Sequence, residues 1–369
     1  MLPLLRTAAL LLLVVTWPAR AADPADRHLL YVAAPGIRDY LQFGGAGVLV
    51  FDVDHNHAFV RRIPTPASRI EKPENVKGVC ACALTKRLYF TTLTELFCLD
   101  LVTEKTVWQK ALPGGCDRLA ITPDGKLLYV PSLEGPHWHV VDAATGDIVK
   151  KLELKSGAHN TICGLDGKYA YLAGLKSPNL SVVDCQTQEV VAKCGPFSAS
   201  IRPFTVNADQ SLCFVNVNEL LGFEVGDLTT GKVLEQVVVK GFQKGKPKRH
   251  GCPSHGIGLT PDETELWLCD AANQHLHVFD LTQSPPKQVA GLPLREQPGW
   301  VTFSIDGKYA YPSTGEVIDV KTKAIVAALK DEKGQPVHSE KMVEIVLKDG
   351  VIVGTGDQFG LGRALPKQK

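Results

Sequence analysis

The chain has 369 residues, of which 44% are hydrophobic, and its 40 basic and 39 acidic side chains give a formal charge of +1. This length and composition are sufficient for a large buried core and exclude a disordered polyelectrolyte. They also exclude nucleic-acid binding driven by bulk charge, because the chain has no excess of Lys and Arg to neutralise phosphates.

Residues 1–22 have the pattern of a signal peptide. Arg6 precedes a hydrophobic run over residues 8–17, which is too short to span a bilayer but suits the core of such a peptide. Small residues at positions 19 and 21 fit a cleavage site, and "ARAAD" disfavours the alternative of an uncleaved anchor. No later segment is long and apolar enough to cross a membrane. We therefore expect an exported protein, periplasmic or secreted, whose mature part is residues 23–369.

The mature chain repeats one hairpin pattern, in which two hydrophobic runs flank a turn built on aspartate. These aspartates recur at intervals of 42, 43, 53, 44 and 43 residues, and a shorter relative, "ALTKRLYFTT" over 83–92, lies one period earlier. A second type of hairpin, with an acidic residue before a polar turn, also occurs seven times. The anchoring residues of the first type are Asp124, Asp166, Asp209, Asp262, Asp306 and Asp349.

Four short strands repeated about every 40–45 residues are typical of a β-propeller. The sequence predicts an all-β fold, a single seven-bladed propeller with four-stranded antiparallel blades. The chain begins with a second-type hairpin, about 48–62, and ends with a first-type hairpin, about 343–354. We expect these two to share one blade and close the ring. The segment "HLLYVAAP" over 28–35 competes with "VIVGTG" for the second strand of that blade.

The segments "PDGKLLYV…HVVDAATGDIV" and "SHGIGLTPDETELWLCD…HVFDL" resemble the repeats of YVTN-type, YncE-like β-propellers, which are exported bacterial proteins related in architecture to WD-repeat proteins. The resemblance covers essentially the mature chain, although blades two and five lack the PDG turn. It implies a seven-bladed ring outside the cytoplasm. It implies no single activity, because this architecture carries binding modules and several enzymes.

Ten cysteines in an exported chain raise the question of disulfides. Cys163, Cys213 and Cys269 fall inside hydrophobic strands, where a thiol packs as a small apolar group. Cys116 and Cys252 each lie in a loop just before a strand, and they are the better candidates for a bridge. The sequence assigns no pairing pattern.

The predicted site is the funnel on the face where the chain enters the first strand of each blade. Counting back seven residues from each anchoring aspartate gives one ring of positions, and the next residue gives a second ring. Loops that enter the blades of a rigid ring commonly carry ligand sites. The first ring is Asp117, His159, Arg202, His255, Gly299 and Met342; the second is Arg118, Asn160, Pro203, Gly256, Trp300 and Val343.

Two chemistries fit this rim. In one, Arg118, Arg202 and Lys341 hold a carboxylate or phosphate, helped by a basic insertion over 240–254, while Trp300 stacks on the ligand. Asn160 and the two ring histidines complete this predicted ligand-binding set. The insertion accounts for the 53-residue interval, and its five Lys and Arg residues can attract an anion or cover the pocket.

In the other chemistry, His159 and His255, with Met342 or His338, bind copper or another transition metal, since imidazole and thioether suit such ions. The alternative is that these histidines only mark the repeat and bond to loop backbone. Hydrolysis of a lactone or ester would need one of the ring histidines as base, and no nucleophile elbow accompanies them.

The sequence favours an exported binding protein for a small anionic ligand or a protein partner, with no nucleic acid and no membrane span after cleavage. A metal-dependent or lactonase-like enzyme in the same funnel is the alternative, and the sequence does not decide whether the protein is an enzyme. The two hypotheses differ in whether His159→Ala or His255→Ala abolishes activity or only weakens binding. An interaction platform on the sides of the ring would leave the funnel residues dispensable.

Overall fold

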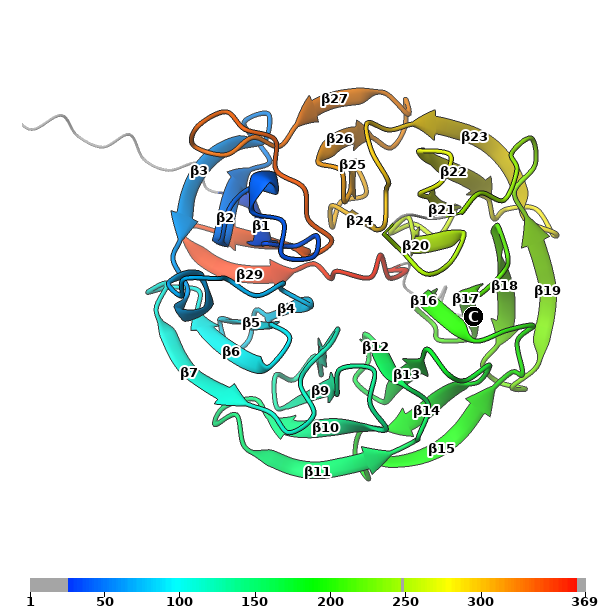
Figure 1. Ribbon diagram of the computed structural model, residues 1–369, viewed down its shortest axis with the longest axis horizontal. Coiled ribbons are helices and arrows are strands. Elements are labelled where there is room, and N and C mark those ends of the chain that lie inside the picture. Colours follow the sequence, from blue (N-terminus) through cyan, green and yellow to red (C-terminus); the bar gives the residue numbers. More distant parts are fainter. Residues whose placement is uncertain (1–25, 247–248, 364–369) are drawn as a thin grey trace, which may run out of the picture.

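The computed structural model describes residues 26–246 and 249–363, so the predicted signal peptide lies outside the described residues. The strands form seven antiparallel sheets around a common centre (Figure 1). This confirms the seven-bladed β-propeller. Within the described ranges, no helix has the length and hydrophobicity needed to cross a membrane. The helices there are two short 3-10 turns, η1 (Leu41–Phe43) and η2 (Pro66–Ser68).

Six blades each contain four strands that follow one another in the chain, with the first strand nearest the centre of the ring (Figure 1). They are β4 (Gly78–Cys82), β5 (Arg87–Thr91), β6 (Glu95–Asp100) and β7 (Thr106–Ala111); β8 (Ala120–Ile121), β9 (Leu127–Pro131), β10 (His137–Asp142) and β11 (Ile148–Glu153); β12 (Ala158–Cys163), β13 (Tyr169–Gly174), β14 (Leu180–Asp184) and β15 (Glu189–Cys194); β16 (Ile201–Val206), β17 (Leu212–Val217), β18 (Gly222–Asp227) and β19 (Val233–Val238); β20 (Ser254–Leu259), β21 (Glu265–Asp270), β22 (His275–Asp280) and β23 (Lys287–Pro293); β24 (Val301–Phe303), β25 (Tyr309–Pro312), β26 (Glu316–Asp319) and β27 (Ile325–Ala328).

The seventh blade joins the two ends of the described chain, which confirms the predicted closure. Its order is β29 (Val351–Thr355), β28 (Met342–Lys348), β1 (Asp26–Ala34), β2 (Gly47–Asp52) and β3 (Ala58–Ile63). Of the two competing segments, "HLLYVAAP" supplies the second strand, because β1 pairs with both β28 and β2. "VIVGTG" forms β29, a fifth strand on the other edge of β28.

The aspartates that mark the repeat stabilise turns. In the first type of hairpin, Asp124 accepts hydrogen bonds from the Thr122 hydroxyl and the Lys126 amide. In the second type, Asp142 accepts from the amides of Ala144 and Thr145. Such side-chain-to-backbone bonds close a turn without help from neighbouring blades. This local role explains why the same residue recurs at one place in each hairpin.

Neighbouring blades pack through hydrophobic side chains that alternate along their inner strands. Tyr31 and Val50 of the closing blade, for example, belong to one buried cluster with Val79 and Phe90 of the next. The outermost strands differ, since β15 buries only its last residue, Cys194. Burial therefore decreases from the centre of the ring outward, as expected when only the outer edge meets water.

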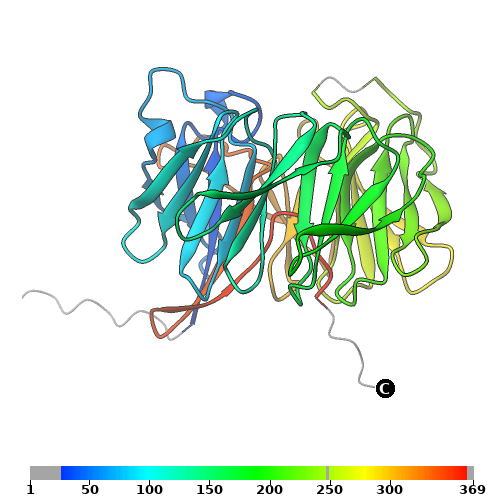
Figure 2. The ribbon, with the colours of Figure 1, turned by 90° about the horizontal axis from the view of Figure 1, so that it is seen from below.

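The segment after β29 runs from the closing blade toward the centre of the ring (Figure 1). Edge-on, β29 lies toward one face and the turns η1 and η2 toward the other (Figure 2). The Gln358 side chain accepts from the Val79 amide at 2.6 Å, and the Gly360 carbonyl accepts from the Leu259 amide at 2.8 Å. Phe359 is buried in a cluster with Trp300. This segment ties several inner strands together.

All ten cysteines are free thiols. The two bridge candidates are each buried: Cys116 packs in a hydrophobic cluster, and the Cys252 thiol donates to the Ser254 carbonyl at 2.9 Å. The prediction of a Cys116 or Cys252 bridge is therefore not fulfilled. Buried thiols here serve as small packing groups.

We expect Phe359→Ala to lower the free energy of unfolding by about 3 kcal/mol, because the substitution leaves a cavity beneath Trp300. Urea denaturation measures this value. Val351→Ala on β29 is the matched control, since that side chain is half exposed and its loss should cost less than about 0.5 kcal/mol. Equal effects of the two substitutions would show that the terminal segment does not stabilise the ring.

Glu344 on β28 makes the stability of the protein depend on pH. Burial raises the pKa of this carboxyl to about 7, although it accepts a hydrogen bond from the Ile305 amide. The folded protein then binds more protons than the unfolded chain between about pH 4.5 and pH 7. We therefore expect the free energy of unfolding to fall by about 1–3 kcal/mol from about pH 5 to about pH 8 through this group. Glu344→Gln should remove this fall in the free energy of unfolding. If the parent and the variant lost the same free energy between these pH values, the pH dependence would not come from Glu344.

Candidate functional site

A polar cavity of about 140 Å³ opens where the chain enters the inner strands, and we call it the top-face cavity. Its lining comes from several blades, because each entry loop delivers one or two side chains to the same place. Cationic groups outnumber carboxylates in this lining. The cationic residues of the lining are Arg38, Lys77, Arg118, Arg202, Arg249 and Lys341, and the acidic residues are Glu134 and Glu340.

The structure brings five of the predicted ligand-binding residues together in this lining: Arg118, His159, Arg202, His255 and Lys341. The remaining two lie just beneath or beside it. The Trp300 ring is buried and packs against Arg118, with its centroid 4.3 Å from the guanidinium carbon, so Arg118 rather than a ligand occupies the face that was predicted to stack on the ligand. Asn160 is buried, and its backbone pairs with that of Arg118 in an isolated parallel bridge.

Two residues of the predicted metal set lie elsewhere. Met342 packs in a hydrophobic cluster with Leu30 and Val32 between blades. His338 stacks on Phe43, with ring centroids 4.4 Å apart. Neither side chain is part of the cavity lining.

The basic insertion approaches the cavity with its last residues. Arg249, His250 and Gly251 belong to the lining. Lys244 instead pairs with Glu219 on the outside.

The centre of the lining is a buried ion-pair network around Glu340. One carboxylate oxygen, Oε2, accepts from Arg118 Nη2 and from Lys341 Nζ, the latter at 2.8 Å. Lys341 Nζ also donates to the Gly36 carbonyl at 3.0 Å. Burial alone would raise the pKa of Glu340, but Lys341 and Arg118 outweigh it and hold the pKa well below the usual range. Glu340 is therefore ionised and fixed in position.

A second pair, Asp117 and His159, extends this network. Asp117 Oδ2 accepts from His159 Nδ1 at 2.7 Å, and Lys77 Nζ lies 3.3 Å from Oδ1. Although burial opposes ionisation, His159 and Lys77 bring the pKa of Asp117 to about 2. Burial lowers the pKa of His159 despite the neighbouring carboxylate, so the imidazole is neutral.

An aspartate–histidine pair of this kind could orient a general base, but the second ring nitrogen is already engaged. With Nδ1 donating to Asp117, Nε2 of His159 must accept, and Arg118 Nη1 lies 3.1 Å away as its donor. The lone pair that a base would use is therefore occupied by Arg118. Both nitrogens of His159 are also unavailable to a metal ion.

Four charged residues of the lining were not predicted from the sequence, namely Arg38, Lys77, Glu134 and Glu340, and His250 was predicted only as part of the insertion. None of them lies at a ring position counted from the repeat. Lys77 precedes β4 in the blade without an anchoring aspartate, and His250 lies in the insertion. Glu340 lies two residues before Met342, the residue that the count selected in the closing blade.

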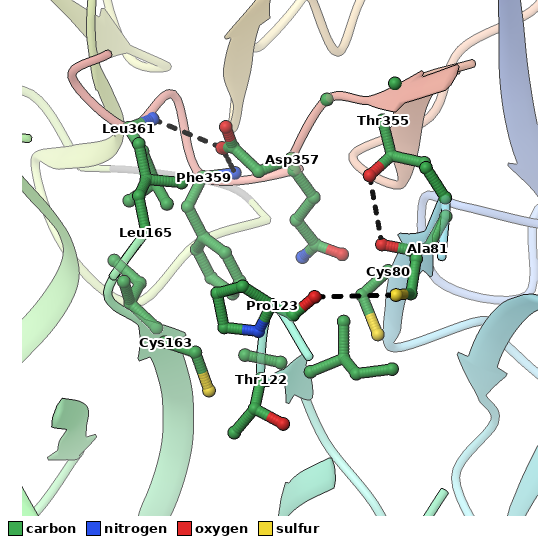
Figure 3. Close-up of a pocket in the computed structure, with 18 of the residues that line it drawn as sticks. Cys80, Ala81, Thr122, Pro123, Cys163, Leu165, Thr355, Asp357, Phe359 and Leu361 are labelled. Carbon is green, nitrogen blue, oxygen red and sulfur yellow. Dashed lines mark hydrogen bonds between the residues drawn. The ribbon is translucent and has the colours of Figure 1, made fainter. Parts of the chain in front are cut away.

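A second cavity, of about 330 Å³, lies between the inner strands β4, β8 and β12 and the terminal segment (Figure 3). Its lining is mostly apolar and includes Phe359, Leu361 and the cysteines Cys80 and Cys163. Burial raises the pKa of Cys80 well above its ordinary value, so this thiol is a poor nucleophile. The chemistry-bearing groups are therefore in the top-face cavity.

No protein-family model and no curated protein matches the chain. Among solved structures, it is similar to hydrazine synthase of Kuenenia stuttgartiensis, at 15% sequence identity and a TM-score of 0.47. That similarity covers 71% of this chain and 97% of the other. The assignment of the fold rests on the seven blades themselves, and the YVTN-type family resemblance stays a prediction.

Proposed function

We propose that this propeller binds a small anionic ligand, with a carboxylate or phosphate group, in the top-face cavity. The observation that carries the proposal is the set of six cationic side chains in the lining, two of which, Arg38 and Arg202, have no acidic partner among the described residues. Charges that converge between low-dielectric walls attract anions more strongly than charges on an open surface.

Two of the cations have spare donors for such a ligand. Arg202 donates to the Asn218 side chain at 2.6 Å and to the Gly251 carbonyl at 3.2 Å. Arg38 donates to the Arg249 carbonyl at 2.6 Å. Among the described residues neither guanidinium forms a salt bridge, and a guanidinium has five N–H donors. Each can therefore offer a two-pronged contact to a carboxylate or phosphate.

The remaining cations are bound to carboxylates, so they supply positive charge to the site rather than free donors. Arg118 and Lys341 are held by Glu340, Lys77 by Asp117, and Arg249 by Glu296. Their charges still contribute to the field in the cavity. The volume suits a small molecule rather than a protein segment.

Binding by the cationic side chains is the role that this geometry supports best, and His159 is not placed to act as a base because Arg118 occupies the lone pair that it would use. Together with the predicted signal peptide and the YncE-like repeats, this supports a ligand-binding protein that works outside the cytoplasm, periplasmic or secreted, as part of the same proposal.

We expect Arg202→Gln to weaken anion binding at least about tenfold, because it removes a charged donor and keeps a side chain of similar length. Isothermal titration with inorganic phosphate, acetate and succinate measures the affinity. Affinity in the parent should fall as salt is raised, since added ions screen the attraction.

Lys110→Gln is the matched control, because Lys110 lies on the outer strand β7 and pairs with Asp147 far from the cavity. This variant should bind as the parent does. Absence of binding to all three anions in the parent, or equal affinity of the two variants, would refute the proposed role.

A further inference from the structure

Three donor groups meet at the rim of the top-face cavity: His250, His255 and Glu340. One ligand atom from each lies within 4.8 Å of the others. In the described part of the chain they are the one such set of three His, Cys, Asp or Glu residues. They come from the insertion, from β20 and from the loop before β28, so the fold rather than a sequence motif brings them together.

His255 is held in the tautomer that a metal ligand needs. Its Nδ1 lies 2.7 Å from the Gly299 carbonyl, which can only accept a hydrogen bond, so Nδ1 carries the proton. Nε2 then presents a lone pair. Metal-binding histidines are commonly fixed by such a bond from the other ring nitrogen to a backbone carbonyl.

Glu340 has one oxygen engaged and one available. Oε2 accepts from Arg118 and Lys341, whereas Oε1 faces His250 Nε2 at 3.7 Å, too far for a hydrogen bond. Two charged donors thus orient the carboxylate and leave Oε1 directed at the imidazole.

The Nε2 atom of His250 is the third candidate ligand atom, and the rest of the described chain does not explain its burial. Its side chain is only 9% exposed, yet its Nε2 has no hydrogen-bond partner among the residues that the structure describes. A buried polar atom without a partner costs free energy, so such an atom calls for an explanation. The ring stacks on that of His255, with centroids 4.2 Å apart, which places the two imidazoles beside each other.

We propose that His250, His255 and Glu340 form a binding site for a divalent first-row transition metal ion. Two imidazoles and one carboxylate are a ligand set that Zn²⁺ and Fe²⁺ accept, with coordination positions left open. Ligand atoms about 2.1 Å from such an ion lie roughly 3.3 Å apart, so the three groups must draw together on binding. His250 can make this adjustment, because it lies in the loop between β19 and β20.

This site does not depend on the proposed anion binding, since the metal ion alone occupies it. The positive charges of Arg118 and Lys341 would repel a metal ion. Both side chains are bound to Oε2 of Glu340, however, so the ionised carboxylate lies between them and the proposed ion. The open coordination positions would face the cavity, where an anionic ligand could complete them.

The experiment titrates the metal-free chain, carrying no histidine tag, with Co²⁺ in a buffer without carboxylate or phosphate. We expect one Co²⁺ per chain, a visible absorption spectrum of nitrogen-and-oxygen-ligated Co²⁺, and displacement by Zn²⁺. His250→Ala and His255→Ala should each weaken binding at least about hundredfold. His338→Ala is the matched control and should bind as the parent does, because His338 stacks on Phe43 away from the site.

Gly299→Ala tests the position of the site without removing a donor. A Cβ at residue 299 would lie 2.1 Å from His250 Nε2 and 2.8 Å from Glu340 Oε1, so it would fill the space for the ion. This variant should also lose Co²⁺, and thermal melts without metal should show that each variant is folded. The proposal is overturned if the parent takes up no stoichiometric metal. It is equally overturned if folded His250→Ala and His255→Ala variants keep the parent spectrum.

Discussion

The pairing of β1 with β28 is the constraint on which the rest of the structure depends. It closes the ring, and it also fixes the loop that precedes β28 against the loop that follows β1. Gly36 and Ser339 form a parallel bridge there, and Lys341 donates to the Gly36 carbonyl. Glu340 is thereby placed at the centre of the top-face cavity. A ring closed in another register would leave Arg118 buried without its carboxylate, which is a costly arrangement.

The buried charges form one chain of contacts, from Lys77 through Asp117, His159 and Arg118 to Glu340. Removing such pairs from water costs free energy that their attraction only partly recovers. A well-packed apolar plug would stabilise the ring at least as well. The network is therefore better explained by what it positions, namely a rigid set of donors around a small space, than by a contribution to stability.

The repeat could be predicted because its signal is local. Aspartates such as Asp124 and Asp142 close their own turns, so spacing alone located the hairpins and, through them, the ring positions of His159 and His255. Glu340 could not be found in this way, because its place depends on strand pairing between distant ends of the chain. Counting back from the anchoring aspartate selected Met342 instead. This residue begins β28, and its side chain packs in the core. His250 lies in the insertion, which has no counterpart in the other blades. The repeat therefore gives no prediction of where the His250 side chain lies.

The terminal segment is tied to the top-face cavity through Trp300. Trp300 contacts a lining residue of each cavity: its ring packs against Arg118, and its indole nitrogen donates to the Gln358 carbonyl. Because Gln358 and Gly360 are bound to the inner strands, the centre of the ring is filled at this level. The top-face cavity and the second cavity share no lining residue. Entry loops of several blades line this cavity together with Arg249, His250 and Gly251 of the insertion, so its shape depends on the loops and not on one blade.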